Sequence, residues 1–435
     1  MFLNFGMEKQ TVSLDSKNWK ARVILLVIVI LAVLYGWWSV QVQLGSMLSE
    51  LTLPTDPNAE QKAEISGQLA PHNPTSKWLA ASLEKDKFEP DSAENSVKMF
   101  EDVIRRSPYD FRWWIELART YEQTDRIPQA ETAFRRAIQL APNYTFPHWQ
   151  AGNFYLRQGR TEEAFASLKK TTENNLAYRE QVFSLAWEYF DKDPSKVEQF
   201  AGDSADTRAY LALFLAGRKS PMDSLWIWNT LTDEEKAANA VVSKTITQSL
   251  YELRNFKAAL EFSRQVGIDP QAQMETVSNG GFEKPIAPKG ESYFGWNMID
   301  TEKMKVEFDP NQKREGSRSM RVVFTGYAKP DLFNIWQSVA IEPLKEYRLS
   351  FWVRTENLRS GGPPTIEIVN PADMRPLVVS KPFPNGTNDW QEVVIDFITP
   401  ENTEGVIIKT GRVSCGEDCP IVGTFWYDDF KISKL

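Results

Sequence analysis

Histidine and cysteine are scarce in this chain, which has two of each among 435 residues. Neither His72 nor His148 belongs to an HExxH motif or to a Ser/His/Asp order, and no GxxxxGK[ST] loop occurs. Cys415 and Cys419 have no histidine near them, whereas a zinc site normally needs four ligands. These absences predict a protein that is not an enzyme and that lacks a zinc centre.

Positive charge is limited as well. Fifty Lys and Arg residues stand against 58 Asp and Glu residues, so the formal net charge is −8. Such a chain has no general attraction to a polyphosphate, and nucleic acid is not expected as a partner. The 42% hydrophobic and 25% charged composition is typical of a globular protein, and the 15 tryptophans require folded cores or flat recognition surfaces.

One stretch, "VILLVIVILAVLYGWWSVQV" at 23–42, contains no charged side chain. At about 1.5 Å per helical residue it is long enough to cross a hydrocarbon core of about 30 Å. Basic side chains precede it and acidic side chains follow it: Lys9, Lys17, Lys20 and Arg22, then Glu50, Asp56 and Glu60. The positive-inside rule therefore predicts a cytoplasmic tail at 1–22, a single-pass signal-anchor at 23–42 and an extracytoplasmic remainder.

Two alternatives to an anchor are less consistent with the sequence. A cleaved signal peptide would have a shorter apolar run and a small-residue cleavage site, which does not follow here. A buried helix of a soluble domain would not be apolar on every face. After the apolar run, residues 43–72 are polar and punctuated by proline, which is typical of a linker.

The next region contains an internal repeat. The stretch "FRWWIELARTYEQTDRIPQAETAFRRAIQLAPN" and the later "HWQAGNFYLRQGRTEEAFASLKKT" share one pattern of small, large and helix-ending residues. The signature positions are Trp114, Leu117, Ala118, Tyr121, Ala130, Phe134, Ala137 and Pro142, then Ala151, Gly152, Tyr155, Ala164 and Leu168. This pattern resembles the tetratricopeptide repeat family. We expect five or six helix pairs over 73–268, stacked into an all-α solenoid.

The resemblance implies a concave groove that holds a segment of a partner protein. Four arginines in the repeats are candidates for contacting acidic groups of a partner: Arg112, Arg119, Arg135 and Arg136. A solvated helix face explains these residues equally well. The carboxylate-clamp pattern of peptide-binding repeats is not recognisable, so the sequence does not identify the partner.

From about residue 276 the apolar period changes from 3.6 to 2. In "YRLSFWVRT" the residues Tyr347, Leu349, Phe351 and Val353 face one way, and polar residues and Trp352 face the other. Several more short alternating segments follow, separated by "RSGGPP" and "PNGTND". The pattern predicts an antiparallel β-sandwich over 276–435.

Four motifs occur in order along this region: "NGGFEKP", "GSRSMRV", "QSVAIEPLKEYRLSFWVR" and "WYDDFKI". Together they resemble carbohydrate-binding modules of the galactose-binding, jelly-roll type over about 277–435. The resemblance implies a jelly roll and a polysaccharide ligand. The fold class expected for the whole chain is therefore multidomain, with one transmembrane helix, an all-α solenoid and an all-β sandwich.

Sugar rings stack on flat aromatic side chains, so aromatic residues on polar surfaces are the candidate contacts. Five qualify: Trp352, Trp336, Tyr293, Trp296 and Trp390. Trp352 is the strongest, because it shares the solvent-facing parity of Arg348 and Arg354. Trp336, opposite Ile335 in its strand, is expected to join it. Packing against the repeats is the alternative for each of them.

The resemblance also implies a structural calcium ion between the first and last strands, since carboxylate oxygens suit that cation. Its candidate ligands are Glu283, Asp428 and Asp429. We expect Asp428 to share an inward parity with Trp426 and Phe430, where a carboxylate needs a partner or a cation. An exposed acidic pair, or one satisfied by turn amides, is the alternative. No other cofactor is expected.

Outside the cytoplasm, Cys415 and Cys419 are expected to form a disulfide. Closing so short a loop removes little unfolded-state entropy, so its predicted role is local. We expect it to fix the turn before the last strand and to set Asp428 opposite Glu283.

The combined architecture predicts a scaffold anchored in a bacterial inner (cytoplasmic) membrane, with its later domains in the periplasm. Its repeats would bind a protein and its sandwich a glycan or an assembly partner. The architecture is similar to accessory proteins of exopolysaccharide or O-antigen export. The alternative is an accessory carbohydrate-binding subunit of a carbohydrate-active enzyme.

Overall fold

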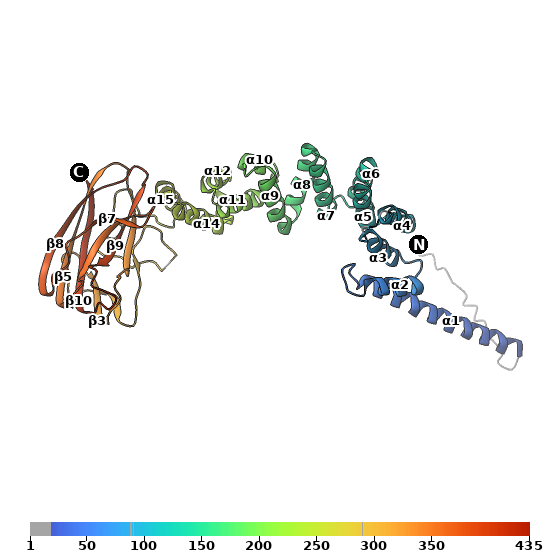
Figure 1. Cartoon of the computed structure of the whole chain (residues 1–435), viewed down its shortest axis with the longest axis horizontal. Helices are drawn as coiled ribbons and strands as arrows, with labels where there is room; N and C mark the ends of the chain where they lie inside the picture. The colour runs from blue at the N-terminus through green and yellow to red at the C-terminus, as the bar shows by residue number, and fades with distance from the viewer. Residues whose placement is uncertain (1–18, 88, 90, 289) are drawn as a thin grey trace, which may run out of the picture. The chain divides into compact units, whose positions relative to one another are not determined.

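The computed structural model describes residues 19–435 apart from 88, 90 and 289 (Figure 1). It divides into two compact units, Met1–Val182 and Phe183–Leu435. Most of the predicted tail at 1–22 lies outside the described residues.

The apolar run forms part of one long helix. Helix α1 spans Trp19–Glu50, and residues 23–40 are all exposed within the chain. By length and composition it is able to cross a membrane, with a mean hydropathy of 2.6 in its most apolar window. The helix does not end where the apolar run ends but continues for two further turns.

The predicted linker at 43–72 is instead ordered helix packed on helix. Helix α2 (Ala59–Leu69) returns along the end of α1, and Ser66 Oγ donates to Gly45 O at 2.8 Å. A Cβ on Gly45 would lie 2.8 Å from Ala70 Cβ, so only glycine permits this approach. The polar composition of the segment reflects a serine-lined helix contact, which is why its sequence looked like a linker.

The first unit continues with the predicted helix pairs (Figure 1). The contact between α7 and α8 shows why the repeat needs a small residue, because a Cβ on Gly152 would lie 2.6 Å from Leu168 Cγ. Phe134 fills the equivalent space one repeat earlier and is fully buried. The helices are α3 (Pro74–Lys85), α4 (Ser92–Arg106), α5 (Phe111–Gln123), α6 (Ile127–Leu140), α7 (Thr145–Arg157), α8 (Thr161–Asn174) and α9 (Leu176–Tyr189), the last of which crosses the unit boundary.

The four candidate arginines of the repeats contact neighbours within their own unit. Arg112, Arg119 and Arg135 form ion pairs of 2.6 to 3.1 Å with carboxylates two to four residues away. Arg136 donates to Gln139 Oε1 at 3.3 Å. These contacts are those of a solvated helix face. His148 is buried with a ring nitrogen 2.9 Å from Pro142 O, which is a packing role.

The second unit begins with further helices. It contains α10 (Pro194–Glu198), α11 (Ala205–Gly217), α12 (Pro221–Asn229), α13 (Asp233–Ala238), α14 (Ala240–Glu252) and α15 (Phe256–Gln265). Trp228 and Phe262 meet edge-on with ring centroids 6.2 Å apart and fill the space between α12 and α15.

The β-region of the second unit is the predicted antiparallel sandwich. The first sheet has the order β1-β4-β9-β6-β7 and the second the order β2-β3-β10-β5-β8. The strands are β1 (Asn297–Met298), β2 (Met304–Asp309), β3 (Ser319–Tyr327), β4 (Ile335–Ala340), β5 (Glu346–Ser360), β6 (Pro364–Asn370), β7 (Arg375–Val379), β8 (Gly386–Ile398), β9 (Gly405–Arg412) and β10 (Ile421–Lys434).

The alternating residues pack between the sheets as predicted. Tyr347, Leu349, Phe351 and Val353 of β5 all lie in the core, each no more than 2% exposed. The inward residues of β4, β6 and β9 oppose them from the other sheet.

The predicted parity of the last strand is wrong over its middle. The register of β10 shifts after Asp428, and Asp429 has a φ of 55°. Such a bulge inserts an extra residue and reverses which face the following residues occupy. Phe430 therefore enters the core, stacked on Phe351 at 4.7 Å, whereas Trp426 and Asp428 lie on the outer face of the second sheet.

Candidate functional site

The outer face of the first sheet brings an aromatic, a cation and a carboxylate into one row. Trp336 of β4 pairs in register with Lys409 of β9, which pairs with Glu367 of β6. The residues that alternate with them, such as Ile335, Ile368 and Ile408, lie in the core. Because side chains alternate between the two faces of a strand, Trp336, Lys409 and Glu367 all point outward from the first sheet.

The aromatic side of this row is a pair of stacked rings. Phe333 and Trp336 lie with ring centroids 4.7 Å apart and planes inclined by 29°. Lys409 Nζ is 5.1 Å from the centroid of Phe333, within the range of a cation–π contact. Phe333 is 38% exposed and Trp336 is half-buried, so the rings offer surface to a ligand.

The charged side of the row is an ion pair that is largely shielded from solvent. Lys409 Nζ lies 3.0 Å from Glu367 Oε2, with side-chain exposures of 23% and 16%. Glu367 also extends over Gly411, where a Cβ would lie 2.8 Å from its Cγ. The glycine keeps the carboxylate on the strand surface, in the centre of the sheet.

Two buried polar groups border this ion pair without protein hydrogen bonds. Asn334 and Thr365 are each 1% exposed, and the amide atoms of Asn334 and the hydroxyl of Thr365 have no partner. Thr365 pairs with Gly411, and Asn334 stands on the outward parity of β4, two residues before Trp336. Unsatisfied buried polar groups cost roughly 1–3 kcal/mol each, so native proteins keep few.

The last helices close the site at one end. Tyr251 of α14 lies 2.6 Å from Ser338 Oγ through its hydroxyl, one outward position beyond Trp336 on β4. Phe256 of α15 covers Gly405 of β9, where a Cβ would lie 2.7 Å from its ring. The outer face of the first sheet is therefore part helix contact and part open surface.

Tyr293, a predicted sugar contact, belongs to this helix contact. Its ring lies 5.3 Å from that of Tyr251, and its hydroxyl donates to Lys244 O at 3.4 Å. Tyr293 therefore joins the sandwich to α14.

Trp296 is not a surface residue. It is 4% exposed and packs in the core against Phe282 and Phe430, at 5.2 and 5.0 Å. It lies in the loop-like stretch immediately before β1, where no alternation predicts burial, which explains why it was predicted as a candidate.

Trp352 and Trp336 do not lie on one surface, contrary to expectation, because their strands belong to different sheets. Trp352 occupies the outer face of the second sheet, where the Arg314 guanidinium lies 4.3 Å from its ring centroid. Trp390 of β8 is half-buried and lies at a register shift between β5 and β8. This face has stacked cations, and its buried side-chain atoms without a hydrogen-bond partner among the described residues are Arg321 Nε and Arg354 Nε.

The carboxylates of the predicted calcium site hold one loop between them. Asp428 Oδ2 accepts from the backbone N–H groups of Arg314 and Glu315, at 2.7 and 3.2 Å. Glu283 accepts from the Ser317 N–H at 3.0 Å and from the Ser317 hydroxyl. The alternative of satisfaction by turn amides accounts for these contacts.

The same two carboxylates have opposite electrostatic environments. Burial raises the pKa of Asp428, although three backbone N–H groups oppose the shift. The Ser317 hydroxyl lowers the pKa of Glu283. Both approach Gly281, whose Cβ would lie 3.8 Å from Glu283 Cγ and 3.9 Å from Asp428 Oδ1. Their oxygens and the buried charge suit a hard cation chemically, and calcium binding by them stays a prediction.

Asp429 does not join this pair. Its carboxylate contacts Lys431 Nζ at 2.6 Å on the exposed side of the bulge. No group of three His, Cys, Asp or Glu side chains converges on a metal position within the described part of the chain.

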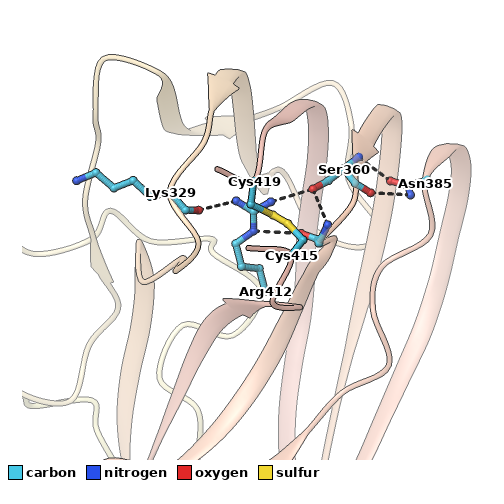
Figure 2. Close-up of a disulfide and its surroundings, with 7 residues drawn as sticks. Lys329, Ser360, Asn385, Arg412, Cys415 and Cys419 are labelled. Atoms are coloured by element: carbon cyan, nitrogen blue, oxygen red, sulfur yellow. Dashed lines mark hydrogen bonds between the residues drawn. A yellow bond between two sulfur atoms is a disulfide. The ribbon is translucent and has the colours of Figure 1, made fainter. Parts of the chain in front are cut away.

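The disulfide between Cys415 and Cys419 is present and lies at the start of β10 (Figure 2). Cys419 N donates to Ala328 O at 2.9 Å, and both sulfurs lie against Gly362. The bridge does not set Asp428 opposite Glu283, because Ile421 beside it pairs with Ser360 and Asp428 pairs with Trp352, far along β5. The bridge instead fixes one end of the sandwich, where the loops that contain Ala328 and Gly362 meet it.

Arg412 is the buried cation beside this bridge. Its guanidinium donates to the carbonyls of Gly362 and Lys329, at 3.1 and 2.7 Å, and to Ser360 Oγ at 2.8 Å (Figure 2). Burial lowers its pKa. The connections that follow β3 and β5 thus converge on one side chain that has no carboxylate partner among these contacts.

The fold and this site define a multidomain binding architecture, an all-α repeat solenoid followed by an all-β jelly-roll sandwich. Residues 274–410 match the family model described as "Carbohydrate binding domain", and residues 112–144 match "Tetratricopeptide repeat". Neither type of domain is catalytic in itself. No curated protein matches the chain.

Solved structures are similar to separate parts of the chain. One titled "CBM4 structure and function" is 18% identical, with a TM-score of 0.28, and the match covers 37% of this chain and 99% of that one. A Clostridium thermocellum xylanase 10B structure is 14% identical, with a TM-score of 0.26, over 37% of this chain and 29% of that one. A MamA structure is 18% identical, with a TM-score of 0.26, over 32% of this chain and 77% of that one.

Sequence reasoning identified Trp336 but missed the polar half of this site. The available signal was polar residues at outward positions of otherwise apolar strands: Thr365 and Glu367 in "TIEIV", and Lys409 in "VIIKTG". Asn334 carried no signal, because its burial depends on neighbours in the folded sheet.

Proposed function

We propose that this protein is a membrane-anchored extracytoplasmic scaffold whose first sheet binds a glycan beside Trp336 and whose repeats bind a partner protein. One observation carries the glycan assignment: the buried, unpartnered amide of Asn334 and hydroxyl of Thr365 flank the Glu367–Lys409 ion pair. Sugar hydroxyls both donate and accept hydrogen bonds, and their apolar ring faces stack on aromatic rings.

The second sheet supports a glycan site less well. Arg314 already covers the ring of Trp352, and Trp426 between Arg321 and Arg354 is 2% exposed. A sugar would have to displace these cations before reaching an aromatic face. Asp428, Arg348 and Arg354 each have a protein partner on this face, and its only buried side-chain atoms without one among the described residues are Arg321 Nε and Arg354 Nε.

A glycan array with the full-length chain in detergent tests the assignment. Trp336→Ala and Glu367→Gln are each expected to weaken binding about tenfold or more, since each removes a contact of about 1.4 kcal/mol or more. Trp352→Ala is the matched control on the opposite sheet and should bind normally. Loss of binding in Trp352→Ala alone would move the site to the second sheet, and no binding to any glycan would refute the proposal.

Anchoring is supported by the length, composition and full exposure of α1 between residues 23 and 40. The charge distribution around it predicts insertion in the inner membrane with the later domains in the periplasm. Carbonate extraction and reporter fusions after residues 22 and 52 test this. Release by carbonate, or an active periplasmic reporter on the first fusion, would refute the anchor or its orientation.

We further propose a role in assembly or export of a bacterial exopolysaccharide or O-antigen. It is supported by the combination of a sugar-module fold, a protein-binding repeat fold and a membrane-spanning helix in one chain. Deletion should abolish or shorten a surface polysaccharide, as judged by gel profile. Intact polysaccharide together with co-purification of a glycoside hydrolase would instead favour the accessory-subunit role.

A further inference from the structure

The end of α1 is hydrogen-bonded to the start of α3, so a membrane spanned by α1 would lie at a defined distance from the first repeat helices. Asn73 Nδ2 donates to Ser46 Oγ, and Ser76 Oγ donates to Ser49 Oγ at 3.4 Å. Ser46 lies four residues beyond Val42, about 6 Å at the rise of an α-helix. The headgroup layer is roughly 5 to 8 Å thick on each side of the hydrocarbon core, so Ser46 falls at its level.

The carboxyl end of α4 lies beside the same loop. Arg106 Nη1 lies 3.3 Å from His72 Nδ1, and His72 immediately precedes Asn73. Arg105 and Arg106 are both exposed in the last turn of α4. The loop that follows them carries Tyr109, whose side chain is 81% exposed. Two arginines, a histidine and a tyrosine are thus gathered near the end of α1.

The charge of this surface is positive in an otherwise acidic protein. Asp102 forms ion pairs with both Lys77, at 2.9 Å, and Arg106, at 3.1 Å, so its single charge balances only one of these two cations. No ion pair to Arg105 is found within the described residues. A hollow of about 430 Å³ opens beside Lys77 and Asp102 between α2, α3 and α4, with Ala63, Gly67 and Ala70 in its lining. The cations suit the phosphate of a phospholipid, and the small apolar side chains beside them suit the start of its acyl chain.

We propose that this surface, formed by His72, Lys77, Arg105, Arg106 and Tyr109, rests on the bilayer and binds anionic phospholipid headgroups. The inference rests on the proposed anchoring by α1. Basic clusters close to a transmembrane segment are attracted to anionic lipid, and tyrosine is enriched at the membrane interface. Contact at this surface holds the first repeats against the membrane in place of free rotation about α1.

Hydrogen exchange of the full-length chain in lipid nanodiscs tests this. Backbone amides of 70–76 and 104–111 are compared in phosphatidylcholine discs and in discs that also contain phosphatidylglycerol. We expect slower exchange with the anionic lipid, and Arg105→Gln/Arg106→Gln should reduce that slowing by roughly fivefold for each arginine. Arg135→Gln/Arg136→Gln, a matched arginine pair on α6, should behave as the unmodified chain.

The outcomes separate this surface from the anchor. Chains that remain in the discs but exchange equally in both lipids would overturn the surface and leave the anchor intact. Chains that leave the discs would overturn the anchor itself. If the arginines merely stabilise the end of α4, the double variant would exchange faster by the same factor in both lipids, which would also overturn the proposal. Arg105→Gln alone, which breaks no ion pair among the residues that the structure describes, is the second variant should the double variant unfold.

Discussion

Glu367 of β6 lies over Gly411 of the neighbouring strand β9, so a methyl group on the glycine would occupy the place of the carboxylate. Only the far end of a flexible side chain must move, which costs little stability. Gly411→Ala should therefore displace Glu367 from Lys409 and weaken glycan binding about tenfold, while the unfolding midpoint changes little. Titration with the bound glycan and thermal unfolding measure the two effects.

Gly361→Ala is the control for this change. A Cβ at Gly361 meets only Cys415 Cβ at 3.8 Å, an ordinary contact. It should leave both affinity and midpoint near those of the unmodified chain. Unchanged affinity in Gly411→Ala would show that the Glu367 carboxylate has no part in the site.

Trp296→Ala is expected to act on stability. The ring is 4% exposed between Phe282 and Phe430, and truncating a buried tryptophan costs about 3–5 kcal/mol. Denaturant unfolding of the sandwich measures this loss, and Trp352→Ala on the surface should lose much less. A stable Trp296→Ala chain that has lost glycan binding would contradict the core assignment and restore Trp296 as a ligand contact.

The sequence was informative where one local pattern determined the result. Alternation in β5 identified the core residues Tyr347, Leu349, Phe351 and Val353, and the small residue Gly152 identified a helix contact. The failures arose where a distant neighbour or a local irregularity decided the outcome. The bulge at Asp429 reverses the face of Phe430, and no periodicity reports such a residue.

The candidate site illustrates the same division. Trp336 was predicted because outward aromatic residues on a strand are visible in alternation. Its partners were not, because the order β4-β9-β6 brings together residues that are 31 to 73 positions apart along the chain. Strand order in a sandwich is set by packing of the whole sheet, which one sequence does not specify.

The buried Asp428 predicts a pH dependence with a definite sign. Its folded-state pKa is raised above 3.8 by burial, so the folded chain holds this proton more tightly than the unfolded chain. Protonated Asp428 therefore contributes fully to stability below pH 3.8, and this contribution is lost as the pH rises through the raised pKa of the folded chain. The free-energy difference between the unmodified chain and Asp428→Asn should fall from acidic to neutral pH in denaturant titrations. A rising difference would show that the fold favours the charged form, and a constant difference would show that the pKa is not shifted by folding.

If calcium binds as the resemblance implies, it would offset the free-energy cost of holding Asp428 in its charged form. A cation at Asp428 and Glu283 stabilises both charged carboxylates and binds only the folded chain, so it should raise the unfolding midpoint. Millimolar calcium, compared with chelator, is expected to raise the midpoint of the unmodified chain but not that of Glu283→Gln or Asp428→Asn. Equal midpoints with calcium and chelator in the unmodified chain would remove calcium from the site.

The disulfide is expected to stabilise the loop end of the sandwich more than the whole. Closing a loop over a separation of four residues is worth about 2 kcal/mol by the chain-entropy relation. The loss in Cys415→Ser/Cys419→Ser should appear as faster hydrogen exchange in 413–420 and 326–331, because Cys419 N bonds Ala328 O. Exchange around Asp428 should not change, since that residue pairs with Trp352 in another part of β5. Faster exchange at Asp428 and Ser317 without change in 326–331 would instead show that the disulfide positions Asp428 relative to Glu283. That is the role that the place of the cysteines before the last strand first suggested.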